Sequence, residues 1–443
     1  MKLRSNEESR VKHATVNNKA KVRIAPTKAG ELAEVVFDDQ SYVLLKDLTA
    51  ASYEIGGVPD GFSVLRYRSA YNNSGRSLAK SLGVGNGYGN GVLEVTAGNI
   101  RTDSSMAVVG GCFGADYASS SATRATGLVR VAGGTFQTDG LGAMQHGWDD
   151  GQPIGLAIGS GTTTLAREGR PFAGRLELSA GLVKNVYGHL MIGIGYGEGT
   201  FVQTGGAVEL NNSAFKSEYS STAEKLESGI KDVVVYATNA TTVVGFAGGC
   251  GRLVISNGSF TAWTELYVGG AGRDAFNIAE WYEGGRMRTP ANLFTAIPME
   301  RHDADGKVTI VGGTYSTDKK VVVGADGRGK LEMIGTSGSF SCGGLVLSNN
   351  TESVLSFRLA EAGVAPVVVN GKMTIVSGSK LRVDLSEFRG RRADLVRFAT
   401  CDGSFDAADI EFVGADKSVR PIVQMLPDRL RCVIPRGLIT VFR

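Results

Sequence analysis

The chain has 443 residues, a hydrophobic content of 42% and a formal net charge of +3. This hydrophobic content is ordinary for a folded protein, which excludes a wholly disordered chain. No apolar run reaches the ~18 residues that a membrane-spanning helix needs, so no membrane span is predicted.

The first 30 residues carry much of the positive charge. They hold eight Lys/Arg and two acids, so they are +6 and the rest of the chain is −3. A basic segment of this kind binds nucleic acid or a membrane surface, or is simply solvated. Because no aromatic residue lies between its cations, we interpret residues 1–30 as a flexible arm and predict no nucleic-acid partner. The start, MKLRSNEESRVKHATV, lacks the apolar core of an export signal, so the chain is either cytosolic or begins downstream of one.

Residues 31–90 contain strand-like runs at 34–37 and 41–45, followed by a polar, Gly-rich stretch. A stack of strands needs cover at its first open edge. We therefore predict that residues 31–90 form an N-terminal cap.

Residues 306–344 hold nearly two copies of one unit. Each copy opens with Gly, continues with two alternating apolar residues such as Val308 and Ile310, turns at a glycine, and places an aromatic residue two positions later. A second apolar run follows. The opening glycines Gly306 and Gly329 are 23 residues apart. A fixed period of this length is typical of repeat architectures, in which each copy buries its apolar face against the next.

The same frame recurs seven times along the chain. The opening glycines are Gly91, Gly127, Gly174, Gly199, Gly251, Gly306 and Gly329. The pattern predicts an all-β fold, a parallel β-solenoid whose repeat body covers residues 91–350. We take the coil as right-handed, although the pattern does not fix its hand. Stacked coils align equivalent positions, so Tyr315 is expected over Phe340 and Val308 over Leu331. One corner position carries glycines that we expect to have positive φ: Gly98, Gly134, Gly206, Gly258 and Gly313.

Two long insertions interrupt the body, at about 212–240 and 272–305. A Ser/Glu capping pattern predicts a short helix near 222–228, and Asp274 is a candidate N-cap for another that ends at Gly284. Residues 351–443 lose the regular frame, and we predict degenerate coils closed by a β-rich C-terminal cap, with residues 436–443 as a final strand.

The five cysteines have no zinc-binding spacing, and the four histidines are dispersed, so no metal or cofactor is predicted. Cys401 and Cys432 either form a disulfide or are free thiols.

The frame G-x-[LV]-x-[VIL]-x-x-G-x-[FYI], followed by an apolar run ending in Val-Gly or Ile-Gly, resembles the repeats of secreted bacterial β-solenoid proteins with autotransporter-associated strand repeats. Residues 367–373, 380–384 and 401–405 look like the terminal part of such chains, and the resemblance covers about residues 85–413. It implies an extracellular or cell-surface location. Neither an export signal nor a C-terminal membrane barrel is recognised, so self-translocation is not expected.

Enzymes on β-helices need carboxylates gathered on adjacent coils. Glu94, Glu177 and Glu332 share an outward frame position, but other copies carry Arg130 or uncharged residues there, which favours a solvated face. The densest local chemistry lies in insertions. Asp149 and Asp150 are the weak catalytic candidates. Ligand-binding candidates are Trp148, Trp281 and Tyr282.

The sequence predicts a structural or adhesive protein, surface-exposed or secreted, that presents loops to surface glycans or to host or matrix proteins. We do not expect an enzyme. Two alternatives stay open: a polysaccharide lyase or glycoside hydrolase on the same fold, and a trimeric phage or appendage fibre. The oligomeric state is not predicted.

Overall fold

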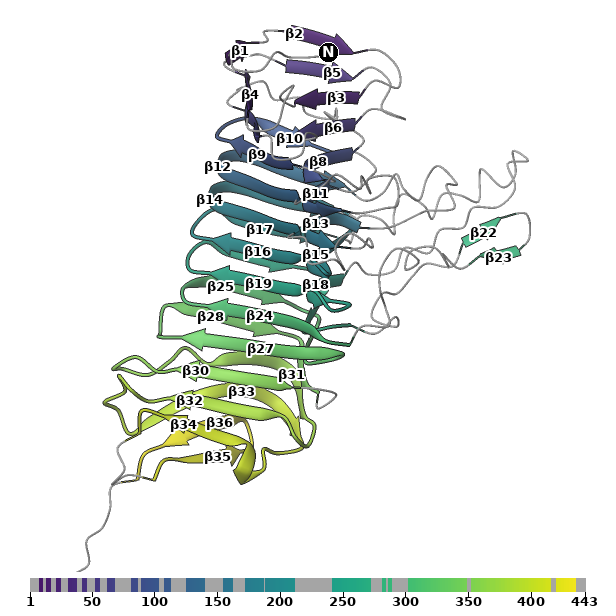
Figure 1. Ribbon diagram of the computed structural model, residues 1–443. Coiled ribbons are helices and arrows are strands. Elements are labelled where there is room, and N and C mark those ends of the chain that lie inside the picture. The colour runs from purple at the N-terminus through teal and green to yellow at the C-terminus, as the bar shows by residue number, and fades with distance from the viewer. Residues whose placement is uncertain are drawn as a thin grey trace, which may run out of the picture.

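In the computed structural model, most of the described residues lie in parallel strands stacked rung upon rung (Figure 1). Thirty-two strands belong to one continuous sheet system, which is the predicted parallel β-solenoid. Among the residues that the structure describes, the only helical element is the three-residue turn η4 (Ala407–Asp409). The described residues are 8–10, 13–16, 21–24, 31–37, 42–45, 52–55, 62–67, 81–86, 89–102, 107–112, 125–139, 154–161, 172–186, 188–211, 241–271, 281–283, 286–288, 302–348, 352–415 and 420–435.

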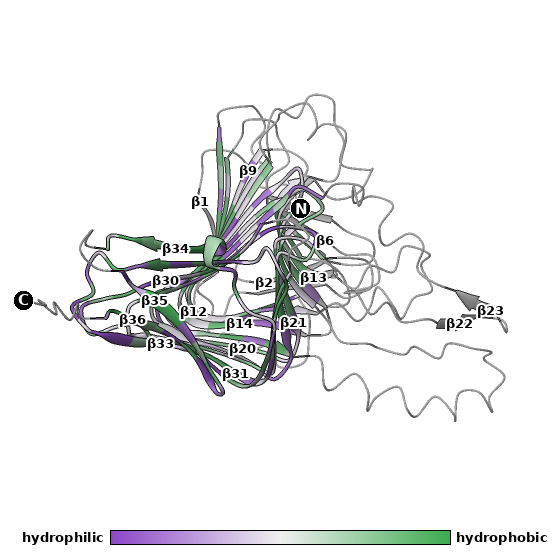
Figure 2. Ribbon diagram, turned by 90° about the horizontal axis from the view of Figure 1, so that it is seen from below, coloured by the Kyte–Doolittle hydropathy of each residue, from purple (hydrophilic) through white to green (hydrophobic). Residues whose placement is uncertain are grey.

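Each coil contributes strands to three walls, which we call faces A, B and C in chain order (Figures 1 and 2). The main face A strands are β4 (Leu32–Phe37), β7 (Phe62–Tyr67), β9 (Gly89–Val95), β16 (Glu198–Gln203), β19 (Cys250–Ile255), β24 (Ala304–Ile310), β27 (Gly327–Ile334), β30 (Ser353–Arg358), β32 (Lys380–Asp384) and β34 (Ile410–Val413). Face B contains β10 (Asn99–Arg101), β17 (Ala207–Asn211), β20 (Ser259–Ala262), β25 (Gly313–Thr317) and β28 (Gly338–Cys342). Face C contains β6 (Ser52–Ile55), β8 (Ser81–Asn86), β11 (Ala107–Cys112), β13 (Ile154–Gly161), β15 (His189–Gly195), β18 (Thr241–Phe246), β21 (Glu265–Val268), β26 (Lys320–Val323) and β29 (Gly344–Leu347).

Some longer strands turn a corner within one element. β12 (Ala125–Asp139) and β14 (Phe172–Val186) run from face A into face B, because their first halves pair with β9 and β16 while their second halves pair with β10 and β17. β31 (Val367–Ile375) pairs with β28 and then with β29, so it runs from face B into face C.

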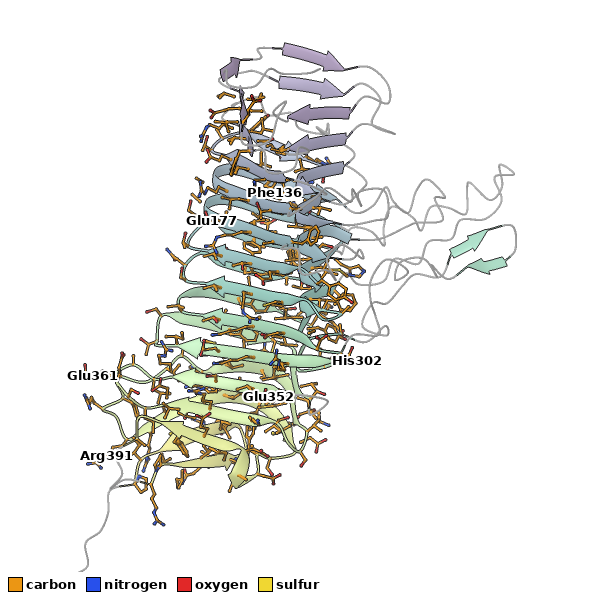
Figure 3. All side chains as sticks on the ribbon, in the orientation of Figure 1. Phe136, Glu177, His302, Glu352, Glu361 and Arg391 are labelled. Atoms are coloured by element: carbon orange, nitrogen blue, oxygen red, sulfur yellow. The ribbon has the colours of Figure 1, made fainter. Side chains whose placement is uncertain are left out.

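Alternation along each strand places one row of side chains inside the coil. The predicted inward pairs, from Leu93 and Val95 to Leu331 and Met333, are at most 1% exposed. Val308 pairs with Leu331, and Tyr315 pairs with Phe340, as the repeat frame predicts. Phe136 lies inside the stack in the same way, while Glu177 projects from its side (Figure 3).

The five glycines expected at corners all lie in the left-handed region, with φ values from 66° at Gly134 and Gly206 to 86° at Gly258. A side chain at Gly313 would be doubly strained. Its φ is 69°, and a Cβ there would lie 2.7 Å from backbone atoms of Asn257 and Gly258 on the preceding coil. This corner lets the chain turn from face A to face B while neighbouring coils stay in contact.

The stack extends further toward the N-terminus than the sequence predicts. In the region expected as a flexible arm, β1 (Glu8–Arg10), β2 (His13–Val16) and β3 (Lys21–Ile24) form parallel pairs with β4, β5 (Tyr42–Leu45) and β6. In the region expected as a cap, β7 pairs residue for residue with β9. The strands β1, β3, β4, β6, β7 and β8 are therefore rungs of the main ladders, whereas β2 and β5 form a separate two-stranded sheet.

The C-terminal end changes from parallel to antiparallel pairing. β33 (Arg392–Asp402) continues from β31 in parallel, but it also pairs antiparallel with β36 (Arg429–Val433). β35 (Ile422–Leu426) completes this closing hairpin. Cys401 and Cys432 are free thiols, so no disulfide joins them. Residues 436–443 lie outside the described residues.

The prediction that a helix extends to Gly284 is wrong. Residues 281–283 form β22 (Trp281–Glu283), which pairs antiparallel with β23 (Arg286–Arg288). The two strands are separated by Gly284 and Gly285, a two-residue spacing that is typical of a hairpin. The helix expected at 222–228 lies outside the described residues.

Candidate functional surfaces

The outer side of face A carries alternating charges. Arg130 lies one rung from both Glu94 and Glu177: its Nη1 is 3.3 Å from Glu94 Oε1, and its Nε is 3.0 Å from Glu177 Oε2. Arg66 continues the row by pairing with both Glu94 and Glu34. Arg130 therefore joins the acids into one ion-paired row, where the sequence predicted only an interruption.

The arginines favour the ionised form of Glu177. A hydrogen bond from Arg175, followed by one from Arg130, lowers the pKa of Glu177 against the opposing effect of burial. A general acid for glycoside cleavage needs the opposite, a carboxyl group whose pKa is raised toward neutrality. Glu177 is therefore poorly suited to protonate a leaving group.

Glu332 is the most buried acid on face A, at 6% exposure. Its carboxylate lies 2.7 Å from Lys307 Nζ and 2.9 Å from Lys330 Nζ. Burial raises the pKa of Glu332, but the hydrogen bonds from the two lysines outweigh this effect and hold the pKa at about 2. Glu332 is thus a structural anion with its charge already neutralised.

The thiol of Cys250, the first residue of β19, lies among charged side chains. Cys250 pairs in register with Glu198 and Asp305, and Arg252 holds Asp305 through contacts of 2.7 and 3.1 Å to its two carboxylate oxygens. Burial raises the pKa of Cys250, so the thiol is not activated as a nucleophile. In the described part of the chain, no three His, Cys, Asp or Glu side chains gather as a metal site.

Face C has an apolar outer row. Its members pair rung by rung from Val108 through Ala157, Met191, Val243, Tyr267 and Val322 to Val346. The row from Val108 to Val322 is at most 7% exposed, although these residues point away from the coil interior. Figure 2 shows the wall that contains β13 and β21. This row belongs to a second packed cluster and is not an open binding surface.

Face B carries an uncharged array of hydroxyl groups. On β20, β25 and β28, the inward residues are Phe260, Tyr315 and Phe340, so the residues on either side of each aromatic point outward. Those outward residues are Ser259 and Thr261, Thr314 and Ser316, and Ser339 and Ser341. They pair in two straight rows, Ser259–Thr314–Ser339 and Thr261–Ser316–Ser341. We call these six residues the hydroxyl grid.

The grid has clear boundaries. On one side, the next outward residues are Ala207 and Glu209, and Glu209 pairs with Lys184 at 3.7 Å. On the other side, Ser341 pairs with Val368. At the end of β20, Trp263 is 39% exposed and directly follows Ala262, the last residue of the strand.

A buried histidine lies at the start of β15. The Nδ1 atom of His189 accepts a hydrogen bond of 2.8 Å from the backbone N–H of Thr241, the first residue of β18. Burial lowers the pKa of His189 to about 4. The side chain is therefore neutral at physiological pH and has a packing role.

The site residues predicted from sequence are not brought together by the described structure. Trp148, Asp149 and Asp150 lie outside the described residues. Trp281 and Tyr282 lie on β22, opposite Arg288 and Met287, and only their backbone is described. Sequence reasoning missed the hydroxyl grid, although the Ser/Thr residues that flank each core aromatic were a readable signal.

Comparisons of the chain with family models, with curated proteins and with solved structures find no match. No helix in the described residues has the length and apolar character needed to cross a bilayer. The resemblance to autotransporter-associated repeats stays a prediction.

Proposed function

We propose that this chain is a structural, adhesive repeat protein, secreted or exposed on a cell surface, that binds glycans or proteins. The observation that carries this proposal is the separation of chemistry among the three faces. Face A has paired charges, face C has a covered apolar row, and face B has uncharged hydroxyls facing solvent. A rod that keeps one kind of surface over several rungs is suited to presentation and attachment.

The alternative of a polysaccharide-cleaving enzyme has less support in the described residues. On face A, basic partners lower the pKa values of Glu177 and Glu332. Cleavage that depends on the catalytic candidates Asp149 and Asp150 would support this alternative.

A binding panel tests the proposal. The purified chain is applied to immobilised neutral glycans, acidic glycans and matrix proteins, and retention is measured. We expect retention on at least one class, with no release of reducing ends or unsaturated products. Turnover that disappears in an Asp149→Asn/Asp150→Asn double variant would replace the adhesive proposal with the enzymatic one. A chain that neither binds nor cleaves any of them would contradict both.

A further inference from the structure

We infer that the hydroxyl grid of face B, together with Trp263, is a binding site for an uncharged polysaccharide. The inference rests on the proposed binding function and names both the ligand class and the place where it binds. The grid lies on regular strands and includes none of the insertion residues that the sequence predicted to bind ligands.

The first step is the geometry of the grid. Neighbouring strands of a sheet are about 4.8 Å apart, and residues i and i+2 of a strand are about 6.7 Å apart. Two rows of three hydroxyls at these spacings form a regular lattice that spans about 10 Å along the stack. The register pairs of Thr314 with Ser259 and Ser339, and of Ser316 with Thr261 and Ser341, leave no offset between rungs. A lattice of this kind favours a ligand that itself repeats.

The second step is the bonding capacity of the grid. Within the described residues, none of the six hydroxyls is used in a side-chain hydrogen bond, whereas the charged side chains along face A are engaged with one another. Each hydroxyl offers one donor and two acceptor positions. Sugar hydroxyls have the same dual character, so the two surfaces can pair without a net charge on either.

The third step is the absence of charge on the grid. The charged side chains named at its borders are already paired: Glu209 with Lys184, and Lys319 with Asp318 at 3.2 Å. An acidic polysaccharide would find no free cation here to compensate the loss of its hydration. The grid therefore selects a neutral chain.

The fourth step is preorganisation. Ser and Thr have short side chains, and the β-branched Thr261 and Thr314 have restricted χ1 angles, so ordering them on binding costs less than ordering Lys or Glu. Beneath them, the rings of Phe260, Tyr315 and Phe340 stack at centroid distances of 5.2 and 4.7 Å. The packed core holds the outward groups at fixed positions before any ligand arrives.

Trp263 supplies the apolar contact that a sugar ring needs. Its backbone N–H donates to Leu210 O at 3.0 Å, which fixes the chain at the end of the β20 rung, and its side chain is 39% exposed. Aromatic rings at binding surfaces provide a large, rigid contact area. A sugar chain lying across the grid would meet this ring at the border.

The test compares three variants of the full chain on insoluble cellulose, chitin and β-1,3-glucan, with pectate and alginate as acidic probes. Thr261→Val/Thr314→Val removes two hydroxyls while keeping β-branched side chains of similar shape. Trp263→Ala removes the ring. Thr200→Val is the matched control, because Thr200 is a half-buried outward threonine on face A. Thermal melting confirms that each variant is folded.

We expect the wild type to bind at least one neutral polysaccharide. The double Thr variant and Trp263→Ala should each weaken that binding on the order of tenfold, and Thr200→Val should not. Equal binding by the double variant and the wild type would overturn the inference while leaving the adhesive proposal intact. Preference for pectate or alginate would also overturn it. Failure to bind any glycan or matrix protein would contradict the adhesive proposal as well.

One further outcome has its own assay. If the wild type binds no sugar but shows thermal hysteresis in ice growth that the double Thr variant loses, the grid orders water and not a polysaccharide. That result would overturn the inference.

Discussion

The ring of Tyr315 lies on the ring of Phe340, with centroids 4.7 Å apart and planes inclined by only 9°. The two residues are 25 positions apart and belong to consecutive rungs of face B. The hydroxyl of Tyr315, however, has no hydrogen-bond partner in the described structure, and the side chain is fully buried. The stack therefore combines favourable ring packing with an unpaired polar atom.

We predict that Tyr315→Phe stabilises the protein. The substitution keeps the ring stack and removes a buried hydroxyl that loses its hydration without compensation, so the free energy of unfolding should rise by about 1–2 kcal/mol. Tyr267→Phe is the control, because the Tyr267 hydroxyl donates to Glu265 Oε2 at 2.7 Å and its loss should destabilise. Chemical denaturation measures both. A decrease for Tyr315→Phe would mean that its hydroxyl has a partner.

We predict that Gly313→Val is destabilising by about 1–3 kcal/mol, since it forces a β-branched residue to adopt positive φ at a crowded corner. Gly344→Ala is the matched control. Gly344 lies on β29 in the following coil, does not have positive φ, and would place its Cβ no closer than 3.4 Å to another atom. Comparison of the melting temperatures of the two variants with that of the wild type tests this prediction. An unchanged value for Gly313→Val would show that this corner tolerates a side chain.

The repeat frame predicted the coil, its inward rows and the Tyr315–Phe340 contact because glycine corners and core aromatics recur in phase. It failed before residue 91 for a physical reason. Ser63 occupies the position that pairs with the opening Gly91, so the first residue of the frame is missing from that rung. Pairing between backbones does not require the glycine, and the ladder continues without it.

The functional surfaces were harder to predict because they depend on relations between coils. Arg130 looks like an interruption when copies are aligned in sequence, but on the adjacent rung it becomes the partner of two acids. Thr314 and Ser316 are unremarkable in one copy, and they form part of a lattice only when three copies stack. Residues in insertions of variable length, such as Asp149, have no frame position from which to infer their neighbours.

We predict that Glu332→Gln lowers the free energy of unfolding at neutral pH by about 1–2 kcal/mol, because it leaves Lys307 and Lys330 without their shared anion. Glu411→Gln is the control, since the Glu411 side chain is 60% exposed and lies 3.7 Å from Arg382. That exposed pair should contribute little. The pKa of Glu332 is about 2, below the ordinary value of 4.5, so its stabilisation is complete above about pH 4.5 and is lost as the pH falls toward 2. Equal effects of the two substitutions would contradict this account.

The last prediction concerns acid sensitivity at the His189–Thr241 contact. The folded pKa of His189 is about 4 and its ordinary value is 6.5, so between these values the unfolded chain binds a proton that the folded chain does not. The contribution of His189 to the free energy of unfolding is therefore largest above about pH 6.5. It falls by up to about 3 kcal/mol as the pH is lowered to 4, where protonation of the ring also removes the Nδ1 acceptor.

Urea unfolding of the wild type and of His189→Gln at pH 7, 5.5 and 4 measures this effect. The variant should be less stable at pH 7, because the buried contact with Thr241 is disturbed, but its stability should decline less with pH. His302→Gln is the control, since it removes a histidine whose side chain is 66% exposed. A wild type and a His189→Gln variant with parallel pH profiles would show that the proton uptake occurs elsewhere in the chain.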